Sequence, residues 1–128
     1  MKTNAEVVRA IYEAFARGDV PTVLESFAPD LSWTEAEGFP HGGIYRGRDS
    51  VVENVLAPLG SEWAPFTVTP EEFVAEGDQV VSLGLYSGTR KETGKSFSAP
   101  YAHVWTLRDG KVVRFRQYTD TAVVQRAL

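Results

Sequence analysis

The stretch TGKSFSAPYAHVWTLRDGKVVRFRQYTDTA, residues 93–122, decides the fold of this chain. Apolar and polar residues alternate on both sides of Arg108-Asp109-Gly110, which predicts two long strands joined by a tight turn. The register of this hairpin decides which side chains share a face, because a slip of one residue turns a whole strand over.

Two registers are open for the hairpin. A two-residue type I′ turn at Asp109-Gly110 would pair His103 with Arg116, and it would mix arginines with apolar side chains on one face. A three-residue loop that also includes Arg108, with Gly110 left-handed at a bulge, would pair His103 with Phe115. We expect the second register because it separates apolar from charged residues. It predicts this inner face: Tyr101, His103, Trp105, Leu107, Val113, Phe115, Gln117 and Thr119.

Composition limits the class of protein. A chain of 128 residues is long enough for one domain with one core, so we expect a single domain over residues 1–128. The net charge of -4 without a basic cluster argues against a nucleic-acid surface. The chain has no cysteine, and its first fifteen residues hold no apolar run of the length that a membrane span or signal peptide needs. We therefore expect a cytoplasmic protein that does not enter membranes.

The rest of the chain predicts helices first and long strands afterwards. A helix is expected from Ala5, capped by Thr3 or Asn4, followed by a short helix that opens at Pro21. A third helix is predicted over residues 49–59, and strands over 31–35, 66–75 and 79–89. A Gly/Pro-rich loop occupies residues 37–47, and Thr119 or Asp120 is expected to cap a last helical turn. This order indicates an α+β fold, in which a curved antiparallel or mixed sheet wraps around the N-terminal helices as a cone. The wide end of such a cone is a natural pocket for a small molecule.

Several short motifs resemble one superfamily. They are YEAF at 12–15 with GD at 18–19, WTE at 33–35, YRG at 45–47, GKV at 110–112 and YTD at 118–120. With the order of elements, they resemble the nuclear transport factor 2-like superfamily, and within it the SnoaL-like group related to ketosteroid isomerases. The resemblance implies a cystatin-like α+β barrel, and it covers nearly the whole chain. It says less about activity, because the superfamily contains isomerases, cyclases, epoxide hydrolases, dehydratases and non-catalytic binders.

The resemblance also implies roles for particular positions. The general base of ketosteroid isomerases falls on Glu35, and the acid that donates to the substrate carbonyl falls on His103. The oxyanion-hole tyrosine falls nearest Ile11, one residue from Tyr12. In polyketide cyclases a histidine and an aspartate point inward; His103 matches the histidine, while Gln117 replaces the aspartate and cannot exchange a proton. The Asp-Arg-Asp set of limonene-type epoxide hydrolases is absent.

Glu35 is the predicted base. It shares a strand face with Trp33, so it points inward if Trp33 is buried. A carboxylate in an apolar cavity has a raised pKa and can act as a base near neutral pH. The alternative is that Glu35 lies at the end of its strand and bonds to loop backbone or solvent.

His103 is the predicted oxyanion donor or proton shuttle. The alternative is a core histidine that bonds to a tyrosine hydroxyl from Tyr101, Tyr86 or Tyr12. Gln117 is expected to orient a ligand or to fix the tautomer of His103. Asp120 is expected to cap a helix on the outer side, and His41 to be a solvated loop residue at the mouth of the cone.

We expect the pocket to bind its substrate through Tyr12, Gln117 and a set of aromatic side chains. That set is Phe15, Trp33, Trp63, Tyr86, Tyr101, Trp105 and Phe115. Two distant histidines make a poor metal site, and no dinucleotide or phosphate motif is present, so we expect neither a metal nor a cofactor.

Two functions are consistent with these residues. The first is cofactor-independent proton transfer beside a carbonyl, as in isomerisation or aldol-type cyclisation of a hydrophobic oxygenated molecule. The second is a non-catalytic module that binds an apolar metabolite in the same pocket. In both cases Ala102, Val104 and Thr106 make the outer sheet face flat enough for a homodimer interface.

Overall fold

A computed structural model describes residues 2–128 of the chain. Helix α1 (Asn4–Ala16) begins in a capping box: the Thr3 hydroxyl accepts from the backbone N–H of Glu6, and the Glu6 carboxylate accepts from that of Thr3. Its apolar stripe, which includes Val8, Ile11 and Tyr12, is buried. Helix α2 (Val20–Glu25) follows at once, because Asp19 caps it through the backbone N–H of Thr22.

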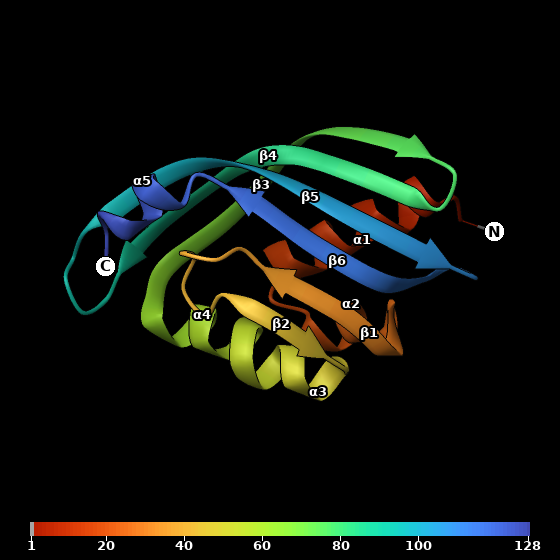
Figure 1. Ribbon diagram of the computed structural model, residues 1–128, viewed down its shortest axis with the longest axis horizontal. Coiled ribbons are helices and arrows are strands. Elements are labelled where there is room, and N and C mark those ends of the chain that lie inside the picture. Colours follow the sequence, from red (N-terminus) through yellow and green to blue (C-terminus); the bar gives the residue numbers. More distant parts are fainter. Residues whose placement is uncertain (1) are drawn as a thin grey trace.

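The strands in the described part of the chain form one six-stranded mixed sheet. They are β1 (Phe27–Glu35), β2 (Gly43–Arg46), β3 (Trp63–Glu76), β4 (Gln79–Arg90), β5 (Ser96–Arg108) and β6 (Lys111–Thr119). The order is β2-β1-β6-β5-β4-β3, with β1 parallel to β6 and every other pair antiparallel. Figure 1 shows the long strands bending together across the molecule, with α1 and α2 behind them.

A helical segment covers the open side of this sheet. It consists of α3 (Arg48–Val51), a π-helical turn η1 (Val52–Leu56) and α4 (Ala57–Glu62). Helix α3 packs against β1 and β2, whereas α4 packs against β3, so the segment spans from one edge of the sheet to the other (Figure 1). The result is the predicted α+β cone: a curved sheet that is not closed into a full barrel, with helices on its concave side.

The β5–β6 hairpin corrects the predicted turn but keeps the predicted face. Asp109 and Gly110 have φ of 52° and 76°, and Arg108 pairs with Lys111, so the turn is the two-residue type. His103 lies opposite Gln117, so the expected pairing with Phe115 is wrong, and the two-residue turn alone, which would pair His103 with Arg116, does not explain it. A register shift supplies the missing residue: Leu107 pairs with Val112 but Thr106 with Arg114.

This shift makes Val113 the extra residue of a bulge. Beyond it β6 is turned over, and Phe115 and Gln117 come to the inner face although the tight turn alone would put them outside. Val112 is buried in place of the expected Val113. Apolar and charged residues are thus separated as predicted, by a bulge inside the strand and not by a longer loop.

Other boundaries also differ from the prediction. Strand β1 begins at Phe27, four residues before the expected Leu31, with an irregularity in its pairing to β6 between Phe27 and Ser32. The Gly/Pro-rich loop contains a strand, β2, that carries too few alternating residues to be recognised from the sequence. The last turn is α5 (Thr121–Gln125), and Asp120 caps it through the backbone N–H of Val123, as expected.

Candidate functional site

A cavity of about 470 Å³ lies between the concave face of the sheet and the helices. Volumes of this size suit small organic ligands. The side chains expected in its wall that do line it are Tyr12, Phe15, Trp33, Glu35, Tyr86, His103, Trp105, Phe115 and Gln117. They come from α1, β1, β4, β5 and β6, so strands far apart in the sequence build one surface.

Two expected wall residues lie outside the lining. Trp63 is buried at the start of β3, where its ring packs against Phe66 and Phe97 with ring centroids 6.1 and 5.2 Å away. Tyr101 stacks on the imidazole of His103 at 3.9 Å between centroids. Both are buried in the core, and neither is among the residues that line the cavity.

Glu35 is a buried carboxylate in the wall of the cavity. Its side chain follows Trp33 on the inner face of β1, and only 3% of the residue is exposed. Oε1 accepts a hydrogen bond of 2.7 Å from the indole N–H of Trp33, while Oε2 is buried without a partner. Burial raises the pKa of Glu35 to about 7, and the hydrogen bond from Trp33 offsets only part of that rise. Near neutral pH this group can therefore both take up and release a proton.

His103 sits at the centre of a line of buried polar groups. Its Nδ1 lies 2.5 Å from the Tyr12 hydroxyl, and its Nε2 bonds to the Tyr86 hydroxyl. The line continues at both ends, because the Trp105 indole donates to Tyr12 at 3.0 Å and the Gln117 amide donates to Tyr86 at 2.8 Å. His103 thus lines the cavity and is also bonded to tyrosines on both ring nitrogens, which combines the two sequence-based alternatives.

Burial keeps the groups of this line neutral. It lowers the pKa of His103 well below 6.5, so the imidazole is uncharged near neutral pH. Burial also raises the pKa of Tyr12 and Tyr86, and the negative charge of Glu35 adds to the rise at Tyr86. Gln117 joins this line to the end of β1, because its Oε1 accepts from the backbone N–H of Ala36 at 2.9 Å. Gln117 therefore links the Tyr86 hydroxyl to the backbone of Ala36, and its amide cannot titrate.

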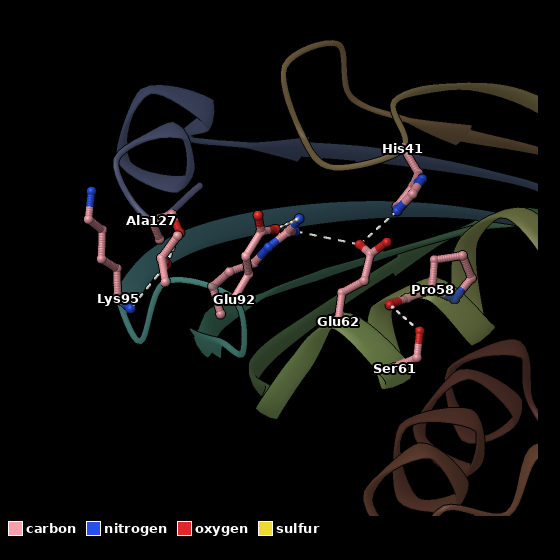
Figure 2. Close-up of polar contacts among 9 residues, drawn as sticks. His41, Pro58, Ser61, Glu62, Glu92, Lys95 and Ala127 are labelled. Atoms are coloured by element: carbon pink, nitrogen blue, oxygen red, sulfur yellow. Dashed lines mark hydrogen bonds and ion pairs between the residues drawn. The ribbon is translucent and has the colours of Figure 1, made fainter.

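His41 lies in the loop between β1 and β2 and outside the cavity. Its Nε2 is 2.9 Å from the Glu62 carboxylate at the end of α4, and Arg90 approaches the same oxygen at 3.5 Å. Figure 2 shows His41 reaching from its loop toward Glu62, above the helix that carries Pro58 and Ser61. The residue is exposed but bonded, so it ties the loop to the covering helix and takes no part in the cavity wall.

The sequence did not identify the other residues that line the cavity. They are Ala16, Gly18 and Val20 where α1 meets α2, Val55, Leu56, Leu59 and Gly60 on the covering segment, and Phe66, Thr67, Val68 and Thr69 on the edge strand β3. Val55, Leu56 and Leu59 have helical spacing, but only the fold shows what this apolar face covers.

Residues 2–128 contain no cluster of three or more His, Cys, Asp or Glu side chains that could hold a metal ion. Within the same range, none of the helices has the length and apolar character needed to cross a bilayer.

Comparison with known proteins places this chain in a family. The SnoaL-like domain matches residues 8–115, and the chain therefore belongs to the SnoaL-like family. A nuclear transport factor 2-like protein from Burkholderia thailandensis is 42% identical, with a TM-score of 0.96 over 99% of this chain and 98% of that one.

Two further solved structures are informative. TerC, co-crystallized with polyporic acid, is 30% identical with a TM-score of 0.87, over 97% of this chain and 96% of that one. A putative SnoaL-like polyketide cyclase from Jannaschia is 22% identical with a TM-score of 0.83, over 97% of this chain and 90% of that one. At that identity it shows a shared fold, which agrees with the resemblance to polyketide cyclases.

Proposed function

We propose that this protein catalyses proton transfer beside a carbonyl, as in double-bond isomerisation or aldol-type cyclisation, without a cofactor. The observation that carries the proposal is Glu35: a carboxylate in the cavity wall, with one oxygen free of hydrogen bonds and a pKa of about 7. A base of this kind is half ionised at neutral pH, where the product of its basicity and its deprotonated fraction is largest.

The cavity supports a neutral, hydrophobic and oxygenated substrate. Its walls are mainly aromatic and aliphatic, with Trp33, Trp105 and Phe115 packed against one another. Among the described residues that line it, none is Lys or Arg, so a carboxylate or phosphate would meet no countercharge beside Glu35. TerC was co-crystallized with polyporic acid, and its likeness to this chain supports a small organic ligand.

In the proposed reaction Glu35 removes a proton from the carbon beside the carbonyl. The C–H bond breaks, its electron pair forms the enolate C=C bond, and the negative charge develops on the carbonyl oxygen. The line of groups around His103 supplies the hydrogen bond that stabilises this oxygen. Glu35 then returns the proton, to a different carbon in an isomerisation. In a cyclisation the enolate carbon attacks a second carbonyl, and Glu35 protonates the new alkoxide.

A second function, binding without chemistry, is favoured by the small number of groups that could exchange a proton with a ligand. Both ring nitrogens of His103 are already hydrogen-bonded, and Gln117 occupies the position where cyclases have an acid. Among the described residues of the wall, this leaves Glu35 without a second acid or base to work with. A binder of this kind would hold its ligand with little dependence on pH between 5 and 8, whereas an enzyme's rate would follow Glu35.

The test is hydrogen exchange into a simple probe. The protein is incubated in D₂O with 2-tetralone, a bicyclic ketone with acidic C–H bonds beside its carbonyl, and deuterium incorporation is followed by mass spectrometry. We expect exchange at those carbons well above the rate in buffer. Saturable binding of the ketone without any added exchange would support the binding function and contradict the enzyme.

We further propose that the protein is a homodimer through the outer face of the sheet, and that it acts in the cytoplasm, which a chain without cysteine suits. Leu83, Ala102 and Tyr118 lie side by side on neighbouring strands of this face, and Leu83 and Tyr118 are 37% and 52% exposed. A flat, partly apolar patch of this kind pairs well with a second copy of itself.

The dimer predicts a defined change in size. Light scattering at micromolar concentration should give twice the chain mass of 14.1 kDa for the wild-type protein and a single chain mass for Leu83→Arg. Ser61→Arg, at an exposed position of α4 away from the outer sheet face, is a matched control that adds the same single positive charge without removing an apolar contact of the patch. A wild-type monomer would remove this proposal and leave the proposed reaction untouched.

A further inference from the structure

The line of polar groups centred on His103 has more hydrogens than internal acceptors. The outer donors, from Trp105 and Gln117, each occupy a lone pair on one tyrosine oxygen. Between those oxygens stand two contacts, Tyr12 to Nδ1 and Tyr86 to Nε2. A neutral imidazole has one N–H, and each tyrosine has one O–H, so three hydrogens serve two contacts. One hydroxyl hydrogen is left over.

The tautomer of His103 decides which tyrosine carries that spare hydrogen. With Nδ1 protonated, His103 donates to Tyr12 and accepts from Tyr86, and the Tyr12 hydroxyl is free to donate elsewhere. With Nε2 protonated, His103 donates to Tyr86 and accepts from Tyr12, and the Tyr86 hydroxyl is free. Both tyrosines line the cavity, so either state offers one donor to a ligand.

We propose that His103 is a tautomeric switch that frees the Tyr86 hydroxyl, and that Tyr86 is the group that donates directly to the oxygen of a bound ligand. His103 is then a positioning residue that acts through Tyr86. The effect of the tautomeric switch on catalysis rests on the proposed function, whereas the change of tautomer on ligand binding does not. The ligand oxygen that accepts the hydrogen bond from Tyr86 is that of a ketone, a quinone or an enolate.

Tyr86 is favoured over Tyr12 by its neighbours. Gln117 donates to the Tyr86 oxygen at 2.8 Å and is held in place by the backbone of Ala36, the residue after Glu35. The charge of Glu35 acts on Tyr86 and is not among the influences on Tyr12. A hydroxyl hydrogen freed at Tyr86 therefore lies on the side of the proposed base, where an enolate oxygen would form.

The tautomer can be measured directly by long-range ¹H–¹⁵N correlation spectra of histidine-labelled protein, because Nδ1 and Nε2 give different patterns. The chain has two histidines, so His41→Gln assigns the signals of His103. Tyr12→Phe and Tyr86→Phe are a matched pair, since each removes one hydroxyl and leaves one N–H donor without its acceptor.

Opposite tautomers are expected in the two variants. A buried N–H is costlier to leave unpaired than a lone pair, so the N–H should turn to the tyrosine that remains. Tyr12→Phe should give Nε2–H and Tyr86→Phe should give Nδ1–H. Saturating wild-type protein with 2-tetralone should raise the Nε2–H population, and Tyr86→Phe should bind the ketone about 10-fold more weakly, with little change for Tyr12→Phe.

Three outcomes would overturn the switch: the same tautomer in both variants, a protonated imidazolium at pH 7, or a wild-type tautomer that saturating ketone leaves unchanged. The third measurement uses the wild-type protein alone, so it tests the switch even if a variant fails to fold. Failure of the proposed reaction looks different: the tautomers would respond as described, while no deuterium enters the ketone.

Discussion

Glu35→Gln is expected to slow deuterium exchange into 2-tetralone by about 10²- to 10⁴-fold, the usual contribution of a positioned general base. The substitution keeps the shape of the side chain, and its carbonyl oxygen can still accept from the Trp33 indole. It removes only the ability to take up a proton. The exchange rate, followed by mass spectrometry, therefore reports chemistry and not packing.

Glu37→Gln is the matched control for this experiment. Glu37 lies two residues further along the chain and is exposed, so its replacement should leave the rate unchanged. In the wild-type protein the rate should rise with pH and level off above about 7, since Glu35 must be ionised to act. A Glu35→Gln variant that exchanges within a few-fold of wild type would exclude Glu35 as the base.

The second large effect concerns stability against pH, because Glu35 and His103 act in opposite directions. The folded-state pKa of Glu35 is raised, so the folded state binds more protons and Glu35 lowers stability as pH rises from about 4.5 to about 7. The pKa of His103 is lowered, so the unfolded state binds more protons and His103 lowers stability as pH falls below 6.5. Between pH 5 and 6.5 the two contributions nearly cancel.

Single variants should remove this cancellation. Glu35→Gln leaves His103 unopposed, so its free energy of unfolding should fall relative to wild type as pH drops from 6.5 to 5, by up to about 1.4 kcal/mol per pH unit. His103→Gln leaves Glu35 unopposed and should show the opposite slope. Urea unfolding at pH 5, 6 and 7 measures both. Parallel profiles for the wild type and the two variants would contradict buried, oppositely shifted groups.

Much of the inner surface could be predicted from alternation alone. Trp33 and Glu35 share a face because they are two residues apart on a strand, and the same holds for His103 and Trp105. The hairpin shows the limit of that reasoning. Asp109-Gly110 is a strong signal for a two-residue turn, whereas the separation of apolar from charged residues favours a longer loop. A bulge at Val113 meets both conditions.

Other parts of the site depend on contacts between distant residues. The partners of His103 come from positions 91 and 17 residues away, and no local pattern selects Tyr12 and Tyr86 over Tyr101. Trp63 has the large aromatic side chain expected of a cavity wall, but its ring packs against Phe66 and Phe97. The helix over residues 48–62 was predicted in part, whereas its position across the open side of the sheet follows from packing against both edges.

The most direct test of this account is the ionisation of Glu35 itself, followed by ¹³C NMR of its side-chain carboxyl carbon, with Glu35→Gln to assign the signal. A carboxylate held in the cavity wall should titrate at about pH 7. A midpoint near the ordinary value of 4.5 would mean that water reaches the group freely, and the protein would then lack the base on which the proposed reaction depends.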